Sequence, residues 1–174
     1  MIVTTSSALR VDVADLLRHG GGRREVHLSA PTGELAGDLS AGPVQMAPGA
    51  DLRVDFSLER VGEGIVARGT VSGSWRAACS RCLVPIERAI SVRVDELFEE
   101  RPVEGETYAI EGDHIDLEPV VRDNLLVELP AAPHCRDDCR GLCPRCGADL
   151  NVASCSCDPD EPDPRWDALR ELHL

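Results

Sequence analysis

The sequence contains no lysine, few aromatic residues and no long apolar run. All 18 of its basic residues are arginine, which we attribute to GC-rich coding and not to function. Aromatic residues make up 3% of the chain. Its core must therefore be aliphatic and lean, and small folds of this kind gain most from a bound metal ion. Because no stretch approaches the length of a membrane span, we expect no membrane association.

Signals for secretion and for common enzymes are also missing. The opening "MIVTTSSALRVDVADLL" has no basic segment followed by an apolar run of signal-peptide length, so we expect a cytoplasmic protein. The chain contains no HExxH, GxSxG, P-loop or GxGxxG motif. We therefore predict that it is not an enzyme.

The charge is strongly acidic, with a formal net charge of −13 at pH 7. Binding nucleic acid through its phosphates needs an excess of cations, which this chain as a whole does not have. Residues 95–118 contain ten Asp or Glu against the single Arg101. We predict an acidic loop here, and two interpretations stay open: a solvated surface loop or a docking surface for a basic protein.

Apolar and polar residues alternate in the middle of the chain, which predicts β-strands. The alternation covers "DLRVDFSLER" at 51–60, and "IVARGTVSGSW" at 65–75 follows it across a "VGEG" turn as the partner strand of a hairpin. A third strand is predicted around 86–95. Cys79 and Cys82 then lie in the connection between the second and third of these strands.

Helical patterns flank the strands. We predict a short helix over Val11–His19, capped by Asp12. A second helix is predicted near 116–129, capped by Asp116 and ended by Pro130. Its core-facing residues would be Leu117, Val120, Val121, Leu125 and Leu129.

These patterns predict an α+β fold, with a mostly antiparallel β-sheet, a packed helix near 116–129 and a C-terminal zinc-binding tail. Residues 1–22 would form an N-terminal segment with a short helix. Residues 23–132 would form a β-rich domain with the acidic loop 95–118. Residues 133–174 would form the cysteine-rich tail, closed by a short terminal helix that displays Trp166, Leu169 and Leu172.

Six of the eight cysteines fall in the tail, and four of them fit one zinc site. "CPRCG" is a C-x-x-C turn in which Pro144 fixes the backbone and Gly147 permits a positive φ. The "CSC" pair returns after a connection long enough to face it. Cys143, Cys146, Cys155 and Cys157 (the tail site) would supply the four thiolates of a tetrahedral zinc.

The other four cysteines suggest a second zinc. Cys79 and Cys82 of "CSRC", with Cys135 and Cys139 of "CRDDC" (the sheet site), would clip the tail to the sheet across a long loop. His134 is an alternative to Cys135, because zinc accepts imidazole equally well. Four thiolates leave zinc no open position, so both ions would be structural.

Three other readings of the cysteines are weaker. Cys139, Cys143 and Cys146 have the C-x3-C-x2-C spacing of radical SAM enzymes, but the βα repeats of that barrel are absent. A thioredoxin-like role for "CSRC" requires a following helix in a βαβ unit, and this pair lies between strands. Disulfides need an oxidising compartment, which the N-terminal sequence does not indicate.

Residues 76–93 form a local basic exception, with four arginines against Glu87 alone. The candidates for RNA phosphate contacts are Arg76, Arg81, Arg88 and Arg93. A solvated strand face explains the same residues equally well.

The order of these motifs resembles the YceD family, the large ribosomal RNA subunit accumulation proteins of bacteria and plastids. The resemblance lies in "CSRC" after a hairpin, "DLEPVVRDNLLVELPAAPHC", "CRGLCPRCGADLN…CSC" and "DPRWDALREL", and covers roughly residues 10–172. The "CPRCG…CSC" knuckle is found in only part of the family. By position, the family's first cysteine pair matches Cys79 and Cys82, and its segment after the helix matches Pro130 to Cys139.

The resemblance implies a role in accumulation or processing of 23S rRNA. We expect a non-enzymatic factor for assembly of the large ribosomal subunit, whose partner is a basic ribosomal protein or a pre-ribosomal particle. Two alternatives remain at this point: a processing protein that binds rRNA or recruits a nuclease, and a structural zinc module for protein interaction.

Overall fold

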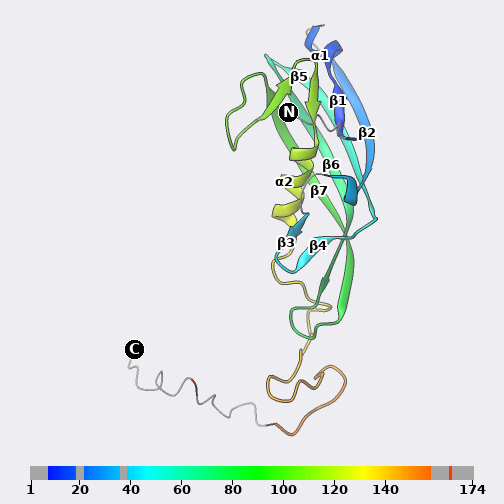
Figure 1. Cartoon of the computed structure of the whole chain (residues 1–174), viewed down its shortest axis with the longest axis vertical. Helices are drawn as coiled ribbons and strands as arrows, with labels where there is room; N and C mark the ends of the chain where they lie inside the picture. Colours follow the sequence, from blue (N-terminus) through cyan, green and yellow to red (C-terminus); the bar gives the residue numbers. More distant parts are fainter. Residues whose placement is uncertain (1–7, 19–21, 36–38, 158–164, 166–174) are drawn as a thin grey trace, which may run out of the picture.

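Nine β-strands are the main regular elements of the computed structural model, which describes residues 8–18, 22–35, 39–157 and 165 (Figure 1). The strands are β1 (Arg10–Asp12), β2 (Arg23–Pro31), β3 (Ser40–Ala41), β4 (Val44–Met46), β5 (Asp51–Val61), β6 (Gly64–Ala78), β7 (Pro85–Glu99), β8 (Tyr108–Glu111) and β9 (His114–Asp116). Two α-helices, α1 (Ala14–Arg18) and α2 (Glu118–Glu128), and a 3-10 turn, η1 (Thr32–Glu34), complete the described elements. The α+β prediction is confirmed in this broad form.

The β6–β7 hairpin is the long axis of the molecule (Figure 1). Both strands have 15 residues, and they pair from Ile65 opposite Phe98 to Ala78 opposite Pro85. At 3.3 Å per residue, a strand of this length spans roughly 50 Å. The hairpin therefore carries its turn, which holds Cys79 and Cys82, well away from the opposite end of the sheet.

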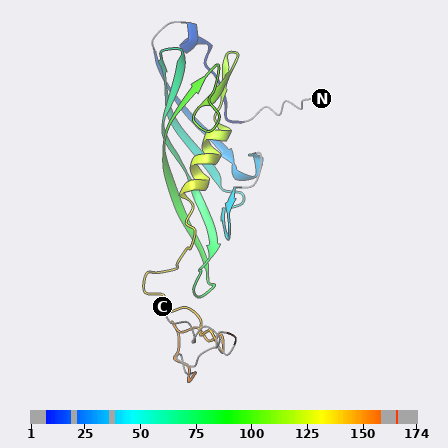
Figure 2. The same ribbon diagram turned by 90° about the vertical axis from the view of Figure 1, so that its left-hand side faces the viewer.

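The other strands flank this hairpin and curl with it (Figure 2). β5 pairs with β6 and β2 with β5, while β8, β9 and β1 follow in that order beyond β7. All these pairs are antiparallel except β7–β8, which is parallel. The prediction of a mostly antiparallel sheet therefore agrees with the structure.

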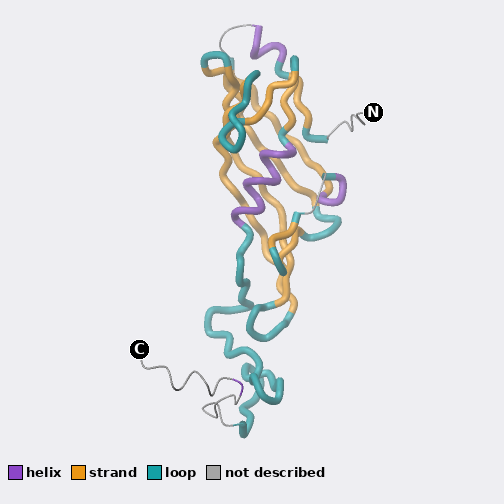
Figure 3. The backbone as a smooth tube through the Cα atoms, turned by 60° about the vertical axis from the view of Figure 1, so that its left-hand side comes forward, coloured by secondary structure: helices purple, strands orange, loops and turns teal. Residues whose placement is uncertain are grey.

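Helix α2 lies along the inner face of the curled sheet (Figure 3). Its side of the core contains the residues expected from the sequence, all at most 6% exposed: Leu117, Val120, Val121, Leu125 and Leu129. The N-cap residue is Leu117, not Asp116 as predicted, and it makes no side-chain cap; Asp116, one residue earlier, accepts a hydrogen bond from the Glu118 N–H at 2.9 Å. The helix ends before Leu129, which is extended. None of the helices in the described ranges is long and apolar enough to cross a membrane.

Glycines allow large residues to pack on the inner face. A Cβ at Gly69 would lie 2.8 Å from the Phe56 ring, and one at Gly73 would lie 2.6 Å from a Leu52 methyl. Both contacts are closer than van der Waals packing allows. With so few aromatic side chains, the core is filled in part by this close approach of Phe56 and Leu52 to the β6 backbone.

The acidic segment 95–118 is not a loop, so that prediction was wrong. Residues 95–99 belong to β7, and β8 and β9 form a short hairpin inside the segment. Ile110 and Ile115 point into the core and pair across this hairpin, whose turn has Gly112 at φ +63°. Two buried isoleucines and a turn glycine are enough to fix the strands, although charged residues dominate the composition.

The predicted N-terminal helix is shorter than expected. Arg10–Asp12 pairs with β9 as a strand, and the helix begins only at Ala14. Asp12 still caps it, because its carboxylate accepts the Ala14 N–H at 2.8 Å. The predicted terminal helix around Trp166 lies outside the described residues.

Candidate metal centres

The turn between β6 and β7 is a tight knuckle around the first two cysteines. The Cys79 N–H donates to the Val84 carbonyl at 2.8 Å, and the Leu83 N–H donates to the Cys79 carbonyl at 3.0 Å. Leu83 has φ +63° and is the one non-glycine residue with positive φ among the described residues. These bonds hold the Cys79 and Cys82 side chains on one side of the turn.

The segment that follows α2 packs against this turn and brings Cys135 and Cys139 to it. The Ser80 N–H donates to the Pro133 carbonyl at 2.8 Å, which joins the knuckle to the segment just before Cys135. Two arginines then bind the segment's carbonyl groups. Arg81 donates to Cys139 at 2.9 Å, and Arg88 donates to Cys135 at 2.8 Å and to its neighbour at 3.1 Å.

The four sulfur atoms of the sheet site lie within 4.8 Å of one another. The distance from Sγ to Sγ is 3.9 Å between Cys79 and Cys139, and 3.6 Å between Cys82 and Cys135. A tetrahedral zinc with bonds of about 2.3 Å places its sulfurs about 3.8 Å apart. The donor set fits that ion. His134, the alternative to Cys135, is not in the group; its carbonyl is bound to Arg88 instead.

The surroundings of the sheet site favour the thiolate form of Cys79 and a cation between its four sulfur atoms. Burial opposes ionisation of Cys79, but backbone N–H groups of its own turn and of Cys135 outweigh it and lower the pKa of this thiol to about 5. Burial and the neighbouring thiols raise the pKa of Cys135 to about 12. Four thiolates this close repel one another, and a divalent cation removes that repulsion.

The tail site is built on a knuckle with the same hydrogen bonds. The Cys143 N–H donates to the Ala148 carbonyl at 2.8 Å, and the Gly147 N–H donates to the Cys143 carbonyl at 2.9 Å. Gly147 has φ +72°, so its role in the turn is confirmed. Gly147 corresponds to Leu83 in the first knuckle. Aligning "CPRCG" with "CSRCL" would have revealed the strained leucine, which our sequence reasoning missed.

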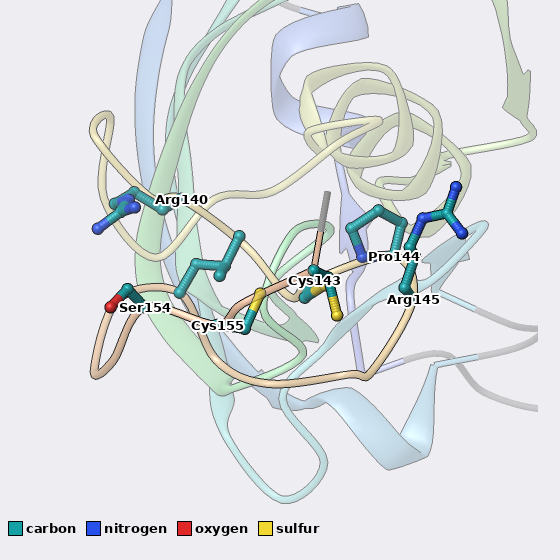
Figure 4. Close-up of a pocket in the computed structure, with 8 residues that line it drawn as sticks. Arg140, Cys143, Pro144, Arg145, Ser154 and Cys155 are labelled. Atoms are coloured by element: carbon teal, nitrogen blue, oxygen red, sulfur yellow. The ribbon is translucent and has the colours of Figure 1, made fainter. Parts of the chain in front are cut away.

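The four sulfurs of the tail site also lie within 4.8 Å of one another, but nearer to solvent. Cys143 is buried, Cys146 is exposed, and Cys155 and Cys157 are half-buried. Figure 4 shows the pocket that Cys143, Cys155 and Cys157 help to line, with the Cys143 and Cys155 sulfurs inside the loop and the Arg145 side chain directed away from it.

In the tail site, as in the sheet site, the pKa of one thiol is lowered and that of another is raised. Backbone N–H groups of Cys146 and Arg145 lower the pKa of Cys143 to about 6. The thiols of Cys146 and Cys143, together with burial, raise the pKa of Cys157 to about 12. In each site the first cysteine of the C-x-x-C turn is the favoured thiolate, because the turn directs N–H groups at its sulfur.

The four candidate RNA-contact arginines do not form one surface. Arg81 and Arg88 are bound to tail carbonyls. Arg88 pairs with Trp75 across the two strands, so both side chains lie on the inner face of the sheet. Arg76 and Arg93 lie on the outer face of the same strands. Arg76 and Arg93 are exposed.

Comparison with known proteins gives one family and several relatives. The family described as "Large ribosomal RNA subunit accumulation protein YceD" matches residues 67–173. A protein of Mycobacterium tuberculosis (strain H37Rv) is 34% identical over 174 residues, which covers 96% of this chain and 82% of the relative. YlbN of Bacillus subtilis is 31% identical over 108 residues, covering 59% of this chain and 63% of YlbN.

A plant relative carries a functional name. The Arabidopsis thaliana chloroplast protein "Large ribosomal RNA subunit accumulation protein YCED homolog 1" is 34% identical over 62 residues. That alignment covers 36% of this chain and 19% of the plant protein. No solved structure matches the chain.

Proposed function

Because the chain belongs to the YceD family of large ribosomal RNA subunit accumulation proteins, we propose that it is a non-enzymatic factor for 23S rRNA accumulation and large-subunit assembly. The observation that carries the non-enzymatic part is the pair of closed four-cysteine groups. Such groups give a metal no open position at which a substrate or water could react.

Zinc is the metal we propose for both sites. Thiolates are soft ligands, and four of them in tetrahedral arrangement select zinc or an iron–sulfur site. The chain residues then act as a scaffold: the sheet site joins the tail to the β6–β7 turn, and the tail site folds the loop from 143 to 157. The ion supplies binding free energy to the folded state and no chemistry.

The partner we propose is a basic ribosomal protein or a pre-ribosomal particle. The support is the placement of acidic residues on the end of β7, the loop 100–107, β8, β9 and the start of α2. The exposed acids of this acidic face are Asp95, Glu100, Glu104, Glu106, Glu111 and Asp113. Three of these acids are balanced by arginines, in the ion pairs Arg68–Asp95, Arg10–Glu111 and Arg18–Asp113. The excess negative charge therefore lies on Glu100, Glu104 and Glu106, which would attract a basic partner, and salt weakens such an attraction.

Two experiments test this proposal together. Depletion of the protein should reduce mature 23S rRNA relative to 16S, and the purified protein should not cut RNA. Tagged protein should capture a basic large-subunit protein at low salt, less at high salt, and less again when the six exposed acids become Gln or Asn. The matched control changes Glu87, an acid on the outer face of the sheet near Arg76, to Gln.

Direct contact with rRNA is the second candidate, and the outer face of the sheet is where it would occur. Arg76 and Arg93 are its candidates, since Arg81 and Arg88 are engaged with the tail. Tight, salt-tolerant binding to naked rRNA that is lost in Arg76→Ala/Arg93→Ala, but survives removal of the acids, would replace the protein partner with RNA.

A further inference from the structure

One side chain of the tail-site loop reaches the sheet site. Asn151 lies between the two cysteine pairs of the tail site, yet its Nδ2 donates to the Cys139 sulfur at 3.6 Å. This bond from an amide N–H to a metal-ligand sulfur joins the two sites. The sequence gives Asn151 no signal beyond its place in "GADLN".

The orientation of the Asn151 amide is fixed by its other bonds. Its Oδ1 accepts from the Arg140 N–H at 2.8 Å and from Arg136 at 2.9 Å. Its Nδ2 also donates to the Asp149 carboxylate at 2.7 Å. Exchanging O and N would place two acceptors together at Asp149 and two donors together at Arg140. The N–H must therefore face Cys139.

Backbone contacts hold the same loop against the first knuckle. The Leu142 N–H donates to the Arg81 carbonyl at 3.0 Å, and the Leu150 N–H donates to the Gly141 carbonyl at 2.9 Å. Gly141 has φ +73°, and a Cβ there would lie 3.0 Å from the Arg81 carbonyl oxygen. The tail-site loop is therefore seated on the turn that holds Cys79 and Cys82.

We propose that Asn151 is a positioning residue through which a metal in the tail site raises the metal affinity of the sheet site. The inference rests on the two-metal part of the proposed function. A metal in the tail site fixes the cysteines on both sides of Asn151 and so orders the loop that presents its N–H. A hydrogen bond to sulfur favours the thiolate, and partners of metal ligands typically change affinity by roughly 10- to 100-fold.

The coupling must act in both directions. If a filled tail site strengthens the sheet site, a filled sheet site strengthens the tail site by the same factor. The tail-site cysteines and Cys139 are then parts of one cooperative unit, although each metal has its own four ligands.

The test uses the full chain loaded with cadmium-113, whose NMR signal reports each thiolate site separately. Cys79→Ser and Cys143→Ser assign the two resonances. Asn151→Asp keeps the oxygen that accepts from Arg140 but replaces the N–H donor. It should shift the sheet-site resonance and lower that site's affinity, measured by chelator competition, by roughly 10- to 100-fold. Asp at position 151 would also face the Asp149 carboxylate, which now accepts from the Asn151 Nδ2 at 2.7 Å. The decisive variant therefore combines Asn151→Asp with Asp149→Asn, which restores a hydrogen bond between the two side chains but no N–H toward Cys139, and in which a purely structural role predicts no change. Val152→Ala, whose side chain is 83% exposed, is the matched control.

A double-mutant cycle then tests the coupling itself. Cys143→Ser empties the tail site and should lower sheet-site affinity in the natural background, but much less when Asn151 is already Asp. This measurement also covers the case in which Asn151→Asp disturbs its own loop, which the tail-site resonance would reveal. An unchanged sheet-site resonance and affinity in Asn151→Asp, or strictly additive effects, would overturn the inference while leaving the rRNA role and the two metals intact. Failure of the unchanged chain to bind two metals would overturn the metal proposal itself.

Discussion

The two cysteine sites share one knuckle design but differ in what surrounds it. In the sheet site, Cys82 and Cys135 are 53 residues apart in sequence, and three of the four cysteines are buried. In the tail site, all four cysteines come from residues 143–157, and Cys146 is exposed. The same set of four cysteines therefore joins segments distant in sequence in one place and the two ends of a short loop in the other. The type of ligand predicts which metal a site binds. The distance in sequence between the ligands predicts whether the site joins distant segments or closes a local loop.

Removing one ligand from each site should give the largest contrast. A structural zinc contributes about 10–16 kcal/mol of apparent binding free energy, comparable to the stability of a whole domain. Cys79→Ser should lose one metal and free the tail from the sheet, so that proteases cut widely. Cys143→Ser should lose the other metal and become sensitive mainly after residue 140. Limited proteolysis with elemental analysis measures both.

Identical digestion patterns for the two variants would contradict the assignment of four cysteines to each site. Iron with a brown chromophore in the unchanged protein, or four disulfides and no metal, would contradict zinc. Ser80→Ala is a suitable control, because this residue lies inside the first knuckle and contributes its backbone N–H, which the change keeps.

The second largest difference between the two sites should be the rate at which each releases its metal to a chelator. A chelator reaches an exposed site more readily, and the surroundings of a site typically change its metal affinity by roughly 10- to 100-fold. The tail site, with Cys146 exposed, should therefore release its metal first. A stopped-flow chelator assay on the zinc protein should show two phases, and Cys143→Ser should remove the fast one. Loss of the slow phase in that variant would reverse the order.

The arginine contacts distinguish the sheet site further. Arg88 donates two hydrogen bonds to tail carbonyls, and Arg93 lies on the opposite face of the same strand. Arg88→Ala should destabilise the metal-loaded protein by about 1–2 kcal/mol, because a donor with charge is lost. Urea unfolding should show little change for Arg93→Ala. Equal effects of the two substitutions would mean that the contacts of Arg88 contribute nothing.

The smallest expected effect compares the residues that follow each knuckle. Leu83 occupies a left-handed conformation at φ +63°, which costs a non-glycine residue about 1–2 kcal/mol. Leu83→Gly should therefore stabilise the protein slightly, by less than that amount, because glycine loses more entropy on folding. Gly147→Leu should destabilise the tail site by about 1–2 kcal/mol. Because metal binding is coupled to folding, the metal affinity of the sheet site tests Leu83→Gly and that of the tail site tests Gly147→Leu. A loss of sheet-site affinity in Leu83→Gly would show that the leucine side chain itself supports the site.

Local periodicity explains which parts of the fold could be predicted. Strands β5, β6 and β7 alternate over many residues, and α2 has its apolar residues on one face, so each pattern was unambiguous. β8 and β9 were missed because four- and three-residue strands offer only Ile110 and Ile115 as core positions among charged neighbours. β2 was missed as a defined strand, since "RREVHLSAP" shows only Val26 and Ala30 fully buried.

The tail-site cysteines were grouped from their spacing and the sheet site from the four that remained, with His134 as an alternative to Cys135; the structure brings the eight cysteines together in these two groups. Spacing works because a C-x-x-C turn has one geometry, set by its own hydrogen bonds. Contacts between the two sites cannot be predicted from a local sequence pattern in this way. Asn151 and the carbonyl contacts of Arg81 and Arg88 depend on how the tail lies over the hairpin, which only the folded chain defines.

The separation of the sheet-site cysteines also sets an order of events in folding. The tail site closes a short stretch of chain, a step of the kind that takes well under a microsecond for about ten residues. The sheet site closes a much longer loop, because β7, β8, β9 and α2 lie between Cys82 and Cys135. On a growing chain, Cys79 and Cys82 leave the ribosome with half of a site and no partner. All four sulfurs of the sheet site are available only after synthesis has passed Cys139.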